Sequence, residues 1–197
     1  MIVIGLTGSI GMGKSTVSAL FREMGVRVFD SDAAVHDLQG PGGALVAEIE
    51  RLFPGTTTHE GVDRARLGAA VFGDRHALVQ LEQLVHPAVG QQRRAFLRCN
   101  RARALVVLDI PLLFETNAAR LVDVVVVVSA PAWMQRRRVL ARPGMTRAKL
   151  RHILRVQTRD TVKRQRADYV IETARSLTQT RRRVRALVAC IAAGKRR

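Results

Sequence analysis

A glycine-rich segment near the N-terminus carries the strongest chemical signal in the sequence. Residues 8–15, GSIGMGKS, match the pattern G-x-x-x-x-G-K-[ST] at every specified position. Glycines let the N–H groups of such a loop turn inward around phosphates, Lys14 supplies a point charge for the β- and γ-phosphates, and Ser15 offers a hydroxyl to Mg²⁺. The pattern predicts a phosphate-binding loop, or P-loop, and does not distinguish a kinase from an ATPase or a GTPase. The residues expected to contact the nucleotide are Gly8, Ser9, Ile10, Gly11, Met12, Gly13, Lys14, Ser15 and Thr16.

Carboxylates follow two of the apolar runs. Asp30 and Asp32 come directly after the run 26–29, and Asp109 ends the run 105–109. A carboxylate beside a P-loop could accept a proton from an acceptor hydroxyl or help to hold Mg²⁺. The alternative for Asp30 or Asp32 is that it caps a helix beginning near Ala33. Asp109 fits the Walker-B pattern, which is weak evidence alone because many strands end in Asp.

Two other segments are candidates for binding an acceptor. His86 precedes Pro87, which should distort a helix or begin one. A lone histidine is more often structural than catalytic. Residues 110–115, IPLLFE, should form an apolar loop. Such a loop either lines a ligand site or is buried beneath a helical segment.

The last third of the chain is strongly basic. Residues 1–130 carry 13 basic and 13 acidic side chains, whereas residues 131–197 carry 20 and three, so the net charge of +17 lies there. A helical pattern broken at Pro143-Gly144 suits a lid whose arginines neutralise a phosphoryl group in transfer. Most of these arginines could equally form a solvated surface, which we expect of 181–183 and 195–197. Aromatic residues, at 4%, offer few stacking platforms for nucleic acid.

The elements that must position these residues alternate between strands and helices. We expect strands at 1–7, 26–29, 105–110, 122–129 and 169–171. We expect helices from the P-loop to Gly25, at about 44–53, 64–72 and 75–100, from Pro131, at 146–158 capped by Thr146, and from Leu177. This alternation predicts an α/β fold with a parallel sheet, helices on both faces and ligands at the carboxyl ends of the strands.

Composition excludes several classes of protein. A chain of 197 residues with 47% hydrophobic and 25% charged residues is neither disordered nor collagen-like. No apolar run approaches the 18 residues of a membrane span, and the N-terminus lacks the basic start of a signal peptide. Two cysteines, Cys99 and Cys190, cannot form a disulfide framework or a zinc site, which favours a reducing cytoplasm.

Taken together, the motifs resemble the dephospho-CoA kinase family, P-loop kinases of the nucleoside-monophosphate-kinase type. The resemblance runs nearly from end to end, and the order and spacing of its segments are highly specific. These segments are TGSIGMGKST at 7–16, FDSD at 29–32, GVDRARL at 61–67, LEQLVHPAV at 81–89, DIPLLFE at 109–115, RVLARPGMT at 138–146, Gln157, Lys163 and ADYVI at 167–171.

The resemblance implies a fold and a reaction. The fold would be a three-layer α/β/α P-loop NTPase with a five-stranded parallel sheet. The reaction would be phosphorylation of the ribose 3′-hydroxyl of dephospho-CoA with ATP and Mg²⁺, the last step of coenzyme A synthesis. A single kinase domain would consist of a core at about 1–39, 104–135 and 168–197, a helical acceptor-binding insert at 40–103, and a helical lid at 136–167.

The resemblance also assigns roles to residues. Asp32 matches the general base, and Arg138 and Arg142 match lid arginines that act with Lys14 in catalysis. The acceptor-binding residues would be Asp32, His86, Pro111, Leu112, Leu113 and Glu115. The chain departs from the family at 172–176, ETARS, where an Asn and a small Gly-Ser turn are usual near the adenine. Adenine contacts there should use the backbone or Thr173. Pro143 replaces a common acidic residue, so the lid turn should be stiffer.

Three alternatives stay open at this point. The chain could be another small-molecule P-loop kinase, acting on a nucleotide or on shikimate. It could be a nucleic-acid-binding ATPase that uses the basic third. A nonenzymatic interaction module is disfavoured by the intact Lys14 and Ser15. We expect a small-molecule substrate, no nucleic-acid or membrane partner, a monomer or weak homo-oligomer, and a cytoplasmic location.

Overall fold

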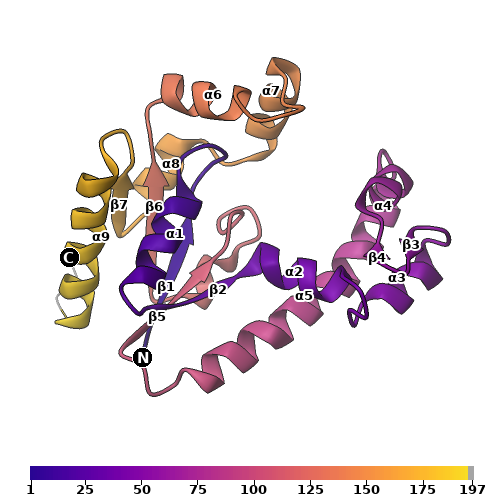
Figure 1. Cartoon of the computed structure of the whole chain (residues 1–197), viewed down its shortest axis with the longest axis horizontal. Helices are drawn as coiled ribbons and strands as arrows, with labels where there is room; N and C mark the ends of the chain where they lie inside the picture. Colours follow the sequence, from indigo (N-terminus) through magenta and orange to yellow (C-terminus); the bar gives the residue numbers. More distant parts are fainter. Residues whose placement is uncertain (195–197) are drawn as a thin grey trace. The chain divides into compact units, whose positions relative to one another are not determined.

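The computed structural model describes residues 1–194 and divides into two compact units (Figure 1). One unit joins residues 1–29 to the chain from Asn100 onward, and the other comprises Asp30–Cys99. The first unit contains β1 (Ile2–Thr7), α1 (Lys14–Glu23), β2 (Arg27–Asp30), β5 (Leu105–Asp109), the 3₁₀ helix η1 (Ala118–Leu121), β6 (Val124–Ser129), α6 (Ala132–Leu140), α7 (Arg147–Val156), α8 (Asp160–Gln165), β7 (Tyr169–Glu172) and α9 (Leu177–Ala192).

The first unit is built on a five-stranded parallel sheet with the strand order β2-β5-β1-β6-β7. Leu6 pairs with Asp109, Thr7 with Val127, and Ser129 with Glu172. The strands therefore end together at one edge, from which the P-loop, the segment after β5, the segment leading to α6, and Thr173 all depart. This edge is where an open parallel sheet binds its ligands.

Both faces of the sheet are buried, as the unbroken Val and Leu runs predict for a central parallel sheet. One face packs against α1 and α9 through the apolar stripe of each helix, including Phe21 and Val184. Side chains that alternate onto the other face, such as Val106 and Val127, are equally buried. The predicted α/β fold with helices around a parallel sheet is confirmed.

Two aspartates set where strands begin. The carboxylate of Asp123 accepts a hydrogen bond from the N–H of Val3 at 2.8 Å, and its own N–H donates to the Val3 carbonyl. Asp168 does the same with Val125, one strand further along. The sixth strand consequently starts at Val124 rather than at the predicted residue 122. The short helix α8 and the 3₁₀ helix η1 were not predicted.

The second unit is mainly helical. It contains α2 (Ser31–Gln39), α3 (Val46–Leu52), β3 (Thr57–Thr58), β4 (Gly61–Val62), α4 (Arg64–Val71) and α5 (Arg75–Cys99), around a core that includes Ile49 and Leu67. Helix α2, which lies within the segment 1–39 predicted to belong to the core, packs on α5. Pro87 lies within α5, which neither begins nor ends there.

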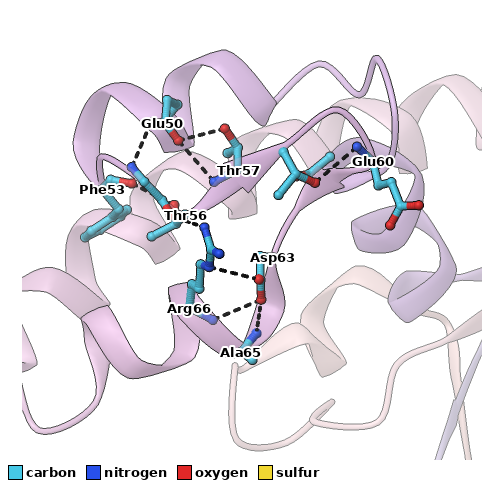
Figure 2. Close-up of polar contacts among 11 residues, drawn as sticks. Glu50, Phe53, Thr56, Thr57, Glu60, Asp63, Ala65 and Arg66 are labelled. Carbon is cyan, nitrogen blue, oxygen red and sulfur yellow. Dashed lines mark hydrogen bonds and ion pairs between the residues drawn. The ribbon is translucent and has the colours of Figure 1, made fainter.

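A polar network holds the β3–β4 hairpin, which the periodicity did not predict (Figure 2). The Glu50 carboxylate accepts hydrogen bonds from the N–H of Gly55 at 2.7 Å and from the hydroxyl of Thr57 at 2.7 Å. Asp63 caps α4 by accepting from the N–H groups of Ala65 and Arg66. The GVDRARL segment thus forms the second hairpin strand and a capped helix start.

The basic C-terminal helix is partly paired with acids. Arg181 contacts Glu23 at 2.9 Å, and Arg183 contacts Glu172 at 3.2 Å, so 181–183 is not simply the solvated run that was predicted. The expectation for 195–197 lies outside the described residues. Among residues 1–194, no helix is long and apolar enough to cross a membrane.

Candidate active site

Three glycines of the P-loop sit where a side chain would not fit. A Cβ on Gly8 would lie 2.6 Å from the carbonyl oxygen of Val128. Gly11 has a φ of 76° and Gly13 a φ of 89°, in the left-handed region that favours glycine. A Cβ on Gly11 would also lie 2.5 Å from Cγ2 of Val139 on α6. The loop therefore lies tightly against β6 and α6.

The loop leads directly into the N-terminus of α1. Gly13 occupies the N-cap position and provides no side-chain cap, and the first turn carries no acidic residue. The first N–H groups of such a helix have no intrahelical partner, and with the helix dipole they attract anions. Ser15 and Thr16, in this turn, are exposed. This end of α1 is suited to bind phosphate groups.

Lys14 lies opposite the Walker-B position. Its ammonium Nζ is 2.5 Å from Oδ1 of Asp109, whose side chain is buried at the end of β5. Because β5 and β1 are neighbours with Leu6 opposite Asp109, the fold itself brings these charges together. The pairing holds the lysine at the strand edge beside the loop, as a phosphate-binding lysine requires.

The residues around the loop fit a magnesium ion held largely by phosphates and water. Among the described residues no cluster of three or more His, Cys, Asp or Glu side chains forms a metal cage. Mg²⁺ in phosphoryl-transfer sites usually keeps several waters and takes few protein ligands. The exposed hydroxyl of Ser15 and the nearby carboxylate of Asp109 supply oxygen donors of that kind.

Thr173 and Arg138 fasten the loop to the end of β7. The Thr173 hydroxyl donates to the Met12 carbonyl at 2.6 Å. Arg138 donates to the Thr173 carbonyl at 2.8 Å and to its hydroxyl at 3.0 Å. Thr173 is buried by these contacts, so its side chain supports the loop instead of facing an adenine. Neither role was predicted from the sequence.

The two predicted lid arginines differ in their surroundings. Arg138, on α6, is half-buried and engaged with Thr173, whereas Arg142 lies exposed just after α6. Between residues 131 and 159 the chain has nine basic residues and no acidic one. An open pocket of about 500 Å³ in this segment is lined by Arg151, Leu154, Arg155, Gln157, Thr158 and Arg159. Such a surface suits a polyphosphate ligand.

The segment after β5 only partly matches the predicted acceptor surface. Leu112 is 41% exposed and Pro111 half-buried, so both could contact a ligand. Leu113 is 0% exposed and points toward the backbone at Gly5, which corrects its prediction as a pocket-lining residue. It is drawn into the core because the glycine in β1 leaves room for its side chain.

Glu115 also differs from expectation. Its Oε1 accepts a hydrogen bond from the N–H of Thr158 at 2.7 Å and lies 2.9 Å from Nζ of Lys163. Burial raises the pKa of Glu115, but Lys163 and the Thr158 N–H outweigh it and hold the pKa below its ordinary value. Its charge is therefore paired within the first unit, and its contact with the acceptor stays a prediction.

The second unit carries the remaining predicted residues. The side chain of Asp30 caps α2, accepting from the N–H groups of Asp32 and Ala33 at 3.1 Å, so the capping alternative is confirmed for Asp30. Asp32 is exposed in the first turn of α2. His86 is exposed on α5, next to Pro87. Exposure leaves Asp32 and His86 available to a ligand.

Three features together define a P-loop kinase. They are a parallel sheet with a P-loop between β1 and α1, a lysine–aspartate pair at the strand ends, and a cationic helical segment after β6. A family model described as dephospho-CoA kinase matches residues 2–179. The chain belongs to the dephospho-CoA kinase family, and it phosphorylates dephospho-CoA with ATP in the final step of coenzyme A biosynthesis.

Individual relatives agree with this assignment. A dephospho-CoA kinase from Novosphingobium aromaticivorans is 59% identical over 189 residues, covering 96% of this chain and 94% of the relative. A Thermus thermophilus protein of known crystal structure is similar with a TM-score of 0.81 and 39% identity, covering 95% of this chain and 96% of that one. A dephospho-CoA kinase from Campylobacter jejuni, at 21% identity, has the same fold, with a TM-score of 0.67 and 96% of each chain covered.

Proposed function

We propose that residues 8–16 bind the phosphates of ATP and that Lys14 moves from Asp109 toward the β- and γ-phosphates when ATP binds. The observation that carries this proposal is the ion pair between Lys14 and Asp109 beside the uncapped start of α1. An ammonium already at the strand edge needs only a small movement to meet a phosphate. Mg²⁺, taken up with ATP and held by the Ser15 hydroxyl, would neutralise charge on the phosphates.

We further propose that Asp32 is the general base and that the ribose 3′-hydroxyl of dephospho-CoA is the nucleophile. Asp32 would accept the hydroxyl proton as the oxygen attacks the γ-phosphorus. Its exposure at the start of α2 supports this role, and Asp30 fixes that start as its cap. His86, Pro111 and Leu112 would contact the acceptor.

Charge neutralisation in the transition state would fall to Arg142. Phosphoryl transfer passes through a loose transition state with charge on its equatorial oxygens, which a cation can stabilise. Arg142 is exposed next to the Pro143-Gly144 turn, whereas Arg138 is already engaged with Thr173. We therefore propose that Arg142 approaches the phosphates and that Arg138 acts by holding the loop.

Small molecules would be the only partners needed for this reaction. We propose that the basic segment serves polyphosphate binding, without nucleic-acid or membrane partners, in a cytoplasmic enzyme that is a monomer or weak homo-oligomer. The absence of acidic residues between 131 and 159 supports an anionic ligand there. Two anionic substrates, ATP and an acceptor that carries its own pyrophosphate, provide that charge.

A coupled assay of ADP release tests the proposal. The assay uses ATP and Mg²⁺ with dephospho-CoA, a nucleoside monophosphate, shikimate or duplex DNA as the added component. We expect ADP release to depend on dephospho-CoA and to fall by at least about 100-fold in Lys14→Met. Arg185→Met, which removes an exposed cation of α9, is the matched control. Equal stimulation by another acceptor or by DNA would contradict the proposal.

A further inference from the structure

We propose that Gln157 is a positioning residue of the ATP site, and that Glu115 holds it in place by accepting a hydrogen bond from the neighbouring Thr158 amide. This inference rests on the proposed function of residues 8–16 as the ATP-binding loop. Neither Gln157 nor Glu115 needs to touch ATP. Their part is to keep the loop in the conformation that ATP requires.

Both backbone polar groups of Ile10, in the middle of the loop, are held by glutamine side chains. The Ile10 N–H donates to Oε1 of Gln157 at 3.1 Å, and its carbonyl accepts from Nε2 of Gln135 at 2.9 Å. Gln135 is on α6 and Gln157 directly follows α7. The conformation of the loop is therefore fixed by one side chain from α6 and one from the residue after α7, and of these only Gln157 lies in the predicted lid.

The residue after Gln157 is anchored in turn. The Thr158 N–H donates to Oε1 of Glu115 at 2.7 Å, and Lys163 pairs with the same oxygen at 2.9 Å. The Lys163 side chain is 0% exposed and that of Glu115 14% exposed, so solvent cannot replace this contact. Fixing the Thr158 amide fixes the backbone direction from which the Gln157 side chain extends.

The segment that carries Glu115 is also hydrogen-bonded to the chain just before the loop. The Thr7 hydroxyl donates to the Pro111 carbonyl at 2.9 Å, only a few residues before Glu115. These hydrogen bonds and the chain between them thus form a closed circuit, which includes residues 7–10, 111–115 and 157–158. A circuit of this kind preorganises a binding loop, because the cost of ordering it is met on folding and not on binding.

Loss of the Gln157 acceptor should therefore appear in ATP affinity. A typical hydrogen bond has a net effect equivalent to about 2- to 12-fold in an equilibrium constant. We expect Gln157→Met, which keeps the length of the side chain but not its acceptor, to raise the KM for ATP by that factor. The KM for dephospho-CoA should stay within about twofold, because the circuit does not include the second unit. The matched control is Gln165→Met, at the exposed end of α8.

Two double variants test whether Glu115 holds the Thr158 amide in place. Replacing Glu115 alone would leave the buried Lys163 ammonium unpaired and could unfold the chain. Glu115→Gln with Lys163→Met removes both charges and keeps an acceptor for the Thr158 N–H, so the KM for ATP should stay within about twofold of wild type. Glu115→Leu with Lys163→Met removes the acceptor too, and it should raise that KM as Gln157→Met does. Adding Gln157→Met to the Glu115→Leu/Lys163→Met variant should raise the KM for ATP little further, because both changes remove the same positioning of the loop.

The outcomes separate this inference from the proposed function. Thermal unfolding without ligand establishes that each variant is folded before kinetics are compared. Equal KM values for ATP in Gln157→Met and Gln165→Met, or in the two Glu115/Lys163 double variants, would overturn the positioning role. Full activity of Lys14→Met would instead overturn the function proposed for the loop itself.

Discussion

The ammonium Nζ of Lys14, the first residue of α1, lies 2.5 Å from Oδ1 of Asp109, the last residue of β5. This contact joins the P-loop to the Walker-B position before any phosphate is bound. The carboxylate of Asp109 is buried, and the ammonium of Lys14 offsets part of the cost of burying its charge, so this contact stabilises the fold. Lys14→Met should accordingly lower the thermal unfolding temperature of the ligand-free protein, and Lys14→Met with Asp109→Leu should recover part of that loss. An unchanged unfolding temperature in Lys14→Met would show that the contact contributes nothing to stability.

Asp32→Asn tests the proposed general base. The amide keeps the size of the side chain but cannot accept the proton, so kcat should fall by about 10²- to 10⁴-fold with little change in ATP affinity. Asp37→Asn, at another exposed position of α2, is the control and should leave kcat unchanged. If Asp32→Asn keeps its kcat, the base assignment is wrong.

Arg138 and Arg142 should respond differently to substitution. Arg138→Met removes two hydrogen bonds to Thr173, and it should lower the free energy of unfolding by about 1–3 kcal/mol. Arg142→Met should lower kcat and leave the free energy of unfolding within about 0.5 kcal/mol, because the side chain is exposed. Urea unfolding and steady-state kinetics on both variants check these expectations. Destabilisation confined to Arg142→Met would reverse the two assignments.

Two glycine substitutions should act in opposite directions. Gly8→Ala places a methyl group 2.6 Å from the Val128 carbonyl, and overpacking of this kind costs about 1–3 kcal/mol. Gly68→Ala, within α4, meets no atom within 4 Å and has no left-handed φ, so it should stabilise the protein by about 0.5–1 kcal/mol. Chemical unfolding of both variants measures the difference. A stable Gly8→Ala protein would show that the loop has more space than its geometry indicates.

The insert should weaken at low pH. The Gly55 N–H and the Thr57 hydroxyl hold the pKa of Glu50 below its ordinary value of 4.5. Since the folded state favours the charged carboxylate, its contribution is complete above the unfolded-state pKa and is lost as the pH falls through the folded-state pKa. Glu50→Gln should therefore reduce the decline of unfolding temperature between about pH 5 and pH 3. An identical decline in both proteins would exclude this contribution.

Local patterns predicted the sheet and the P-loop because both are encoded by neighbouring residues. An apolar run marks each central strand, and the strand–loop–helix order places Lys14 at the sheet edge. The roles of Glu115 and Arg138 could not be read in the same way. Their partners, Lys163 and Thr173, are far along the chain, and nothing in the local pattern states which distant group a charge will meet. At Pro87 the predicted helix at 75–100 is confirmed, and the alternative that this proline begins a helix is wrong, because α5 runs through it.

Analysis of the reaction product tests the central claim most directly. Equimolar ATP and dephospho-CoA are incubated with the enzyme and Mg²⁺, and the products are examined by ³¹P NMR. The account predicts one new phosphomonoester, located on the ribose 3′-oxygen, together with an equal amount of ADP. Release of inorganic phosphate without a phosphorylated acceptor, or a phosphate on another hydroxyl, would contradict it.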